Sequence, residues 1–267
     1  MKDIFDFKRF GKYFVYDLNN AKNSYGISGL ITALSPIVMF TVFCVIGFLK
    51  QGHAGNYPDM LQVAATMIVV ISMITSFTAK AYGNLTEKRF GSDWILVPAS
   101  GLEKTLSMIL TSCLVVPLIL GSIYLATDWL LSVLFNNYPS SLIGSLSLKE
   151  TTDDISFYGG NAVLASWWQT MMAFVLGAIY FKKAKAGKTI LAIFGVTVLL
   201  AMAAGFIING GIGIESAGFE AFLKRITENF DAEKAARLIN VAMNTFNIVI
   251  IAILGGLTYL RVKTIKH

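Results

Sequence analysis

The sequence predicts an all-α membrane protein with six transmembrane helices, and three observations lead to this fold class. The 267-residue chain is 55% hydrophobic and has a mean hydropathy of +0.64. Only 14% of its residues are charged, against about a quarter in soluble domains. Six apolar segments are each long enough to cross a bilayer as a helix of roughly 20 residues. Too little polar sequence remains to wrap them, which disfavours the alternative of buried helices in a large soluble protein.

The expected spans lie in one transmembrane domain, residues 1–267. In chain order they cover about 30–49, 60–79, 105–127, 162–181, 189–209 and 239–260. Pro36 and Pro117 lie inside the first and third spans and should kink them, because proline has no N–H for the helical hydrogen bond. Ala173 and Gly177 form a small-xxx-small pair, which favours close approach of another helix.

The basic residues predict the orientation. Sixteen of the 22 Lys and Arg residues fall before the first span, in the second and fourth loops, or after the last span. The positive-inside rule therefore places both termini and residues 80–104 in the cytoplasm. This bias also accounts for the net charge of +6, so nucleic acid is not an expected partner. Asp128, beside Trp129 at the outer end of the third span, is expected to lie at the interface, and no carboxylate is expected in mid-span.

Residues 1–28 are expected to form an amphipathic helix lying in the membrane interface. Six aromatic residues occur between Phe5 and Tyr16, and basic residues lie away from the apolar side of the helix. The expected membrane-contacting face consists of Phe7, Phe10, Phe14 and Leu18. This pattern is typical of a helix that rests its apolar side on the bilayer. A helix packed against a soluble partner is the alternative.

Residues 210–238 should form an extracytoplasmic loop that contains a second amphipathic helix. Apolar residues recur there at helical spacing, at Phe219, Phe222, Leu223, Ile226 and Phe230. The glycine-rich run before them, NGGIGIESAG, could break the chain or let it dip back into the bilayer.

The loop between the second and third spans, residues 80–104, carries an unusual mixture of residue types: NLTEKRFGSDWILVPASGLEK. A short helix over Glu87–Phe90, a turn at Gly91 and an apolar anchor of Trp94, Ile95 and Leu96 are expected. Pro98 should end this element, and Ser100 with Glu103 has the spacing of a capping box that opens the third span. The loop could grip a cytoplasmic protein, or its apolar residues could simply lie among the lipid headgroups.

The same loop resembles the second cytoplasmic loop of ABC-2 type transporter permeases. The resemblance rests on Glu87, Gly91, Ser92, Leu96, Pro98, Ser100 and Glu103. It covers some twenty residues by motif and nearly the whole chain by its plan of six spans. The spacer from Gly91 to Pro98 is shorter than in that family and contains Trp94. The run PAS-x-LEK is also similar to a group of little-characterised bacterial membrane proteins.

This resemblance implies the permease subunit of an ATP-driven exporter. Its partners would be a cytoplasmic ABC ATPase, which binds the ATP, and a second permease copy or paralogue. The residues implied to couple the permease to the ATPase are Glu87, Lys88, Arg89, Phe90, Gly91, Trp94 and Pro98.

No catalytic, metal or cofactor site is expected on this chain, so it is not expected to be an enzyme. The run AGKT at 186–189 is not a phosphate-binding loop, because Lys182 stands where that motif requires glycine. Cys44 and Cys113 each lie within a span and are expected to serve packing. Two other functions stay open: a membrane scaffold or regulator without a transported substrate, and a channel or carrier.

Overall fold

The computed structural model describes residues 5–53, 55–86, 94, 96–142, 160–208 and 232–265, and all regular elements in these ranges are helices. This confirms the all-α class. Four of the described helices are long and apolar enough to cross a membrane: Asp59–Ala81, Gly101–Leu134, Lys185–Ala203 and Met243–Thr264. A fifth span arises if the bent pair at the N-terminus counts as one. The chain is therefore a multi-pass membrane protein, although the expected six spans are not reached within the described residues.

The first two helices correct the expected boundary between an interfacial helix and a first span at 30–49. Helix α1 runs without interruption over Phe7–Ala33, with Asp6 as its N-cap, and α2 follows over Ser35–Gln51. The two helices form one pair, bent by 41°. Pro36 lies in the first turn of α2, where its missing N–H costs nothing. The bend directly before this turn confirms the expected kink.

The next two long helices return alongside this pair. One consists of α3 (Asp59–Ile71), a π-helical stretch at Ser72–Phe77 and α4 (Thr78–Ala81), and a short 3₁₀ turn covers Gly83–Thr86. The other consists of α6 (Gly101–Leu110), a π-helical stretch at Thr111–Val115 and α7 (Val116–Leu134). The predicted capping box of Ser100 and Glu103 is confirmed at the start of α6. The second π stretch directly precedes Pro117 and widens the turn into which the proline ring fits.

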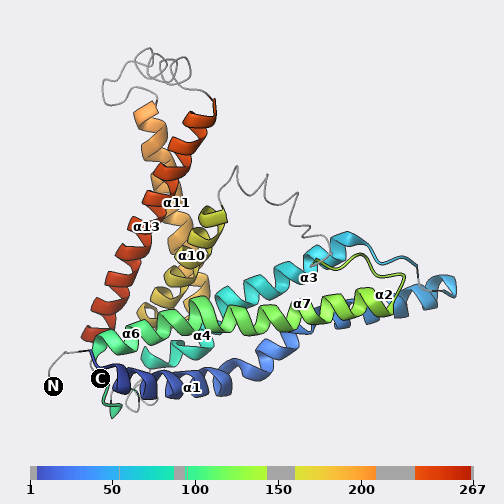
Figure 1. Cartoon of the computed structure of the whole chain (residues 1–267), viewed down its shortest axis with the longest axis horizontal. Helices are drawn as coiled ribbons and strands as arrows, with labels where there is room; N and C mark the ends of the chain where they lie inside the picture. The colour runs from blue at the N-terminus through green and yellow to red at the C-terminus, as the bar shows by residue number, and fades with distance from the viewer. Residues whose placement is uncertain are drawn as a thin grey trace.

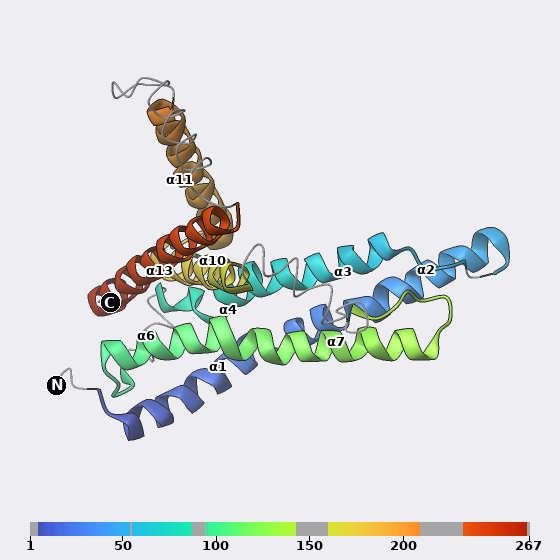
Figure 2. The same ribbon diagram turned by 45° about the horizontal axis from the view of Figure 1, so that its top comes forward.

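Three further helices form the second part of the molecule. They are α10 (Gly160–Tyr180), α11 (Lys185–Ile208) and α13 (Ala232–Thr264). Helix α10 begins and ends within two residues of the predicted span at 162–181, but it is not among the four candidate spans. In Figures 1 and 2, α11 and α13 project away from the long axis that α2, α3 and α7 share. Both termini lie at the end of the molecule where α6 begins (Figure 1).

Close approach at Gly177 holds α10 against the foot of α11. A Cβ atom added at Gly177 would lie 1.9 Å from Thr189 Oγ1, so only glycine fits without movement. The expectation for the Ala173–Gly177 pair is thus confirmed at its second member. The tight connection between the two helices places Ala184 at φ 50°, in the left-handed region.

The main core lies where the two parts meet. Its most deeply buried apolar side chains are Phe77, Tyr82, Met108, Met171, Val175 and Ile179. A smaller cluster of Phe40, Tyr57, Leu131 and Tyr138 closes the far end of α2 and α7. By contrast, α11 exposes large apolar side chains on all sides, such as Leu191 (74%) and Leu199 (67%). This is the exposure expected of a helix whose solvent is lipid.

Several expectations fall on residues that the structure does not describe. The amphipathic stretch of the 210–238 loop lies within 209–231, and only the start of α13 overlaps the rest of that loop. The expected short helix at 87–90 lies outside the described residues as well.

Candidate functional site

A carboxylate clamp joins the start of α1 to the start of α6. The Glu103 side chain is completely buried and lies opposite Arg9, whose exposed fraction is 34%. Arg9 donates from Nη2 to Glu103 Oε1 over 2.6 Å and from Nε to Oε2 over 2.7 Å. The backbone N–H groups of Asp6 (2.9 Å) and Ser100 (2.8 Å) also donate to this carboxylate. The capping box is therefore also the point at which two long helices are fastened together.

Trp94 lies inside this end of the molecule instead of presenting its indole to a partner. Only 7% of the residue is exposed, and its Nε1 donates to the Tyr13 hydroxyl over 2.8 Å. Lys104 donates from Nζ to the Trp94 carbonyl over 2.8 Å, and its ammonium lies 4.4 Å from the centre of an indole ring. This corrects the expectation that the Trp94 side chain is the exposed docking anchor. The alternative of a headgroup anchor meets the same objection, because the ring is not accessible to lipid either.

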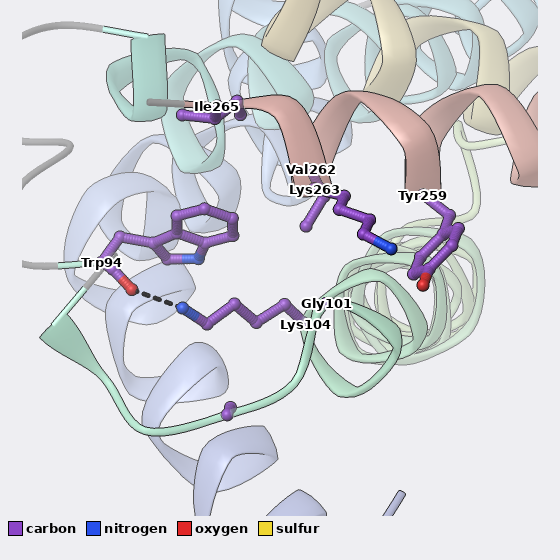
Figure 3. A pocket seen from close by; sticks show the side chains of 8 residues that line it. Trp94, Gly101, Lys104, Tyr259, Val262, Lys263 and Ile265 are labelled. Atoms are coloured by element: carbon purple, nitrogen blue, oxygen red, sulfur yellow. Dashed lines mark hydrogen bonds between the residues drawn. The ribbon is translucent and has the colours of Figure 1, made fainter. Parts of the chain in front are cut away.

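A small cavity separates this tryptophan from the end of α13. Its volume is about 200 Å³, and Figure 3 shows Trp94 and Lys104 on one side with Tyr259 and Lys263 on the other. Val262 and Ile265 complete the α13 wall. The described part of the loop is thus adjacent to both the first and the last helix of the chain.

One buried carboxylate links α1 to the start of the loop and to the helix that follows the loop. Asp17, only 4% exposed, accepts through Oδ2 from Ser107 (2.6 Å), Thr111 (3.3 Å) and the Tyr82 hydroxyl (3.2 Å). Tyr82 lies near the start of the loop, whereas Ser107 and Thr111 follow it. We call Asp17 and its three donors the Asp17 joint.

Two more bonds fasten the second part of the molecule to the same end. Lys185, at the start of α11, donates from Nζ to the carbonyl of Gly83. Arg261, in the last turn of α13, donates from Nε to the carbonyl of Ile179 over 3.3 Å. The loop and the ends of α1, α6, α10, α11 and α13 are therefore connected at this end by hydrogen bonds and the small cavity.

A second buried carboxylate lies at the opposite end of the molecule. Asp128 is completely buried inside the protein, and its expected depth at the membrane interface stays a prediction. Its Oδ1 accepts from Gln62 Nε2 and from the Tyr138 hydroxyl, both over 2.8 Å, and its Oδ2 accepts from the backbone N–H of Leu142 over 2.8 Å. Burial and the hydrogen bond to Asp128 raise the pKa of Tyr138 well above that of an ordinary phenol, so its hydroxyl stays a donor.

The predicted site residues are only partly brought together. Pro98 is exposed, and its neighbour Leu96 is 79% exposed, so both are accessible to a partner. The other predicted coupling residues, Glu87, Lys88, Arg89, Phe90 and Gly91, lie outside the described residues.

The predicted membrane-contacting face of α1 lies at the edge of the helix packing. Phe7 is 82% exposed, and Phe10, Phe14 and Leu18 are half-buried. The adjacent, buried face consists of Tyr13, Asp17, Ala21, Tyr25, Gly29 and Ala33. The sequence analysis missed this face, although its regular spacing of four residues and its small and polar members are a readable signal. Contact of the phenylalanine face with lipid stays a prediction.

The arrangement joins the loop to the ends of several helices through hydrogen bonds. No group of three His, Cys, Asp or Glu residues that could hold a metal ion occurs in the part of the chain that the structure describes. No protein-family model, curated protein or solved structure matches this chain.

Proposed function

We propose that this chain is the permease subunit of an ATP-driven exporter in the bacterial cytoplasmic membrane. A separate cytoplasmic ABC ATPase would bind the ATP and act on residues 80–104, and a second permease copy or paralogue would complete the export path. The observation that carries this proposal is the fastening of the loop to its own protein at several points. A push on a loop that hung free would be lost, whereas a push on a fastened loop moves the helices to which it is bonded.

The bonds run to three different helices. Near the start of the loop, Gly83 is bonded to Lys185 of α11, and Tyr82 is bonded to Asp17 of α1. Within the loop, Trp94 is bonded to Tyr13 of α1 and to Lys104 of α6. Because α6 continues through the second π stretch into α7, a displacement of the loop would be passed into a continuous helix of 34 residues.

The burial of Trp94 moves the proposed contact with the ATPase to other residues. Leu96 and Pro98 are exposed, and both are among the residues that resemble the ABC-2 loop. Trp94 then positions this exposed stretch from inside, as a fixed base. The basic residues Arg9, Lys185 and Arg261 lie at the same end, which supports its placement on the cytoplasmic side.

The test is recovery of an ATPase with the purified permease in mild detergent. Leu96→Ala is compared with Met60→Ala, because both side chains are highly exposed (79% and 83%) but lie in different parts of the structure. Loss of a contact worth about 1.4 kcal/mol weakens a complex tenfold. We therefore expect Leu96→Ala to lower ATPase recovery several-fold at an unchanged permease level, and Met60→Ala to leave it unchanged. Absence of any ATP-hydrolysing protein from the wild-type preparation would refute the proposal.

A carrier is the second candidate, and the two buried aspartates favour it over a scaffold. Buried carboxylates within membrane helices often serve ion or proton paths. Here, however, Asp17 and Asp128 each have three donors in place, which is the pattern of a structural group. Ion flux in liposomes that contain the purified chain alone would favour the carrier, and its loss in Asp17→Asn would identify the path.

A further inference from the structure

A groove of about 680 Å³ runs along α1 from Leu18 to Leu30 and opens beside the start of α7. Its floor consists of the buried side chains Ala21, Tyr25, Phe77 and Leu120. This volume lies in the range of about 300–1,000 Å³ that is typical of small-molecule sites. The groove lies apart from the residues that fasten the loop.

The lining of the groove changes character along the helix. At one end stand three exposed polar side chains, Asn19, Lys22 and Asn23. Further along α1 the lining becomes apolar, at Ile27 (79% exposed) and Leu30 (45% exposed). An occupant that matches both ends must itself have a polar head and an apolar tail.

The groove lies beside one of the candidate membrane spans. Helix α7, Val116–Leu134, is the second part of the continuous candidate span Gly101–Leu134. The groove flanks the first turn of this helix, at Val116 and Ile119. Lys22 is the last basic residue of α1, and the next basic residue along the chain is Lys50, near the end of α2. The long side chain of Lys22 can extend its ammonium toward the headgroups, and the apolar lining suits an acyl chain.

We infer that this groove binds one phospholipid with an anionic headgroup from the surrounding bilayer. Its phosphate would lie against Lys22 and the side-chain amides of Asn19 and Asn23, and one acyl chain would occupy the apolar part. Within the described ranges the structure pairs Lys22 with no carboxylate, so its charge is available to a ligand. A second copy of the chain fits less well, because its helix would have to cover a lysine and two amides. The inference does not depend on the exporter role.

The test is native mass spectrometry of the protein released from mixed micelles that contain phosphatidylglycerol and phosphatidylcholine in equal amounts. We expect one phosphatidylglycerol to be retained in preference to phosphatidylcholine. Lys22→Ala should weaken this preference about fivefold, the contribution of one basic side chain near an anionic membrane surface. Lys12→Ala is the matched control, because this exposed lysine lies on the same helix outside the groove and should have no effect.

A second variant tests the acyl-chain part independently of charge. Ile119 is 53% exposed on the groove wall, so Ile119→Trp can fill the groove without disturbing the core. It should abolish retention of both lipids while the melting temperature stays unchanged. Equal retention of the two lipids by the wild type, or full retention by Ile119→Trp, would overturn the inference. Displacement of the lipid by inorganic phosphate alone would also overturn the inference. A dimer of the chain that Ile119→Trp dissociates would overturn it too, because a second copy would then occupy the groove.

Discussion

Removal of the carboxylate from the Asp17 joint should destabilise the protein to a predictable extent. Asp17→Ala leaves three hydroxyl donors without their acceptor, in a place where Asp17 itself is only 4% exposed. Ser107 and Thr111 can turn toward the backbone carbonyls of their own helix, as Thr105 and Ser112 already do. Most of the cost therefore falls on the Tyr82 hydroxyl and on the small void.

The magnitude follows from these two contributions. A buried donor left without a partner costs about 1–3 kcal/mol, and the void adds to this cost. Because the variant no longer buries a charge at this position, part of the total cost is offset. We expect a loss of about 2 kcal/mol in the free energy of unfolding. For a chain of this size that corresponds to a melting temperature lower by about 4–8 °C. Asp17→Asn keeps one acceptor oxygen among hydroxyls that can also accept, so its loss should be about half as large.

The assay is thermal unfolding in mild detergent, followed by tryptophan fluorescence and by loss of monodisperse protein. Asn20→Ala is the control, because Asn20 is exposed on the same helix and surface changes usually stay within about 0.5 kcal/mol. Equal melting temperatures for Asp17→Ala and Asn20→Ala would show that the joint does not hold α1 to α6. A loss in Asp17→Asn as large as in Asp17→Ala would show that the negative charge matters, rather than the hydrogen bonds.

Three further outcomes are expected. Trp94→Ala removes a buried indole and should cost about 3–5 kcal/mol, visible as a lower yield of folded protein. Trp94→Phe should cost about 1 kcal/mol, because it loses only the hydrogen bond to Tyr13. Normal folding of Trp94→Ala would restore the interpretation of Trp94 as an exposed anchor. Gly177→Ala should lower the melting temperature, because the added Cβ collides with Thr189. Gly205→Ala should leave it unchanged, because there is open space around Gly205. Equal effects of the two variants would contradict the packing of α10 on α11. Ala184→Val should cost about 1–2 kcal/mol, because a β-branched residue is strained in the left-handed backbone conformation of Ala184, whereas Ala184→Gly should cost nothing. The reverse order of melting temperatures would mean that the turn has another conformation.

The sequence analysis succeeded where the determining interactions are local or where lipid is the solvent. The long apolar runs coincide with helices because a membrane span must satisfy its own backbone hydrogen bonds. The capping box of Ser100 and Glu103 was readable because its two members are three residues apart. The role of Glu103 in binding Arg9 was not, because 94 residues separate these two side chains.

The packing of α1 shows why the candidate site was harder to predict. Its phenylalanine-rich face was recognised as apolar, and in a soluble protein an apolar face is the packed one. Next to lipid this preference weakens, and small or polar residues take the contacts between helices. Tyr13, Asp17 and Tyr25 therefore point inward. The burial of Trp94 could not be inferred at all, because its partner Tyr13 lies 81 residues away.

Helix α11 exposes nearly all of its side chains, and only 6% of its most apolar window is buried inside the chain. Each position on such a helix is constrained to be apolar, but not to have a particular side-chain shape. In a saturation library, positions from Ile190 to Met202 should therefore exchange freely among apolar residues and reject charges. Lys185 and Thr189 at its foot should tolerate few replacements, because they contact Gly83 and Gly177. Any apolar position in the upper helix that proves equally strict would reveal the footprint of another protein on α11.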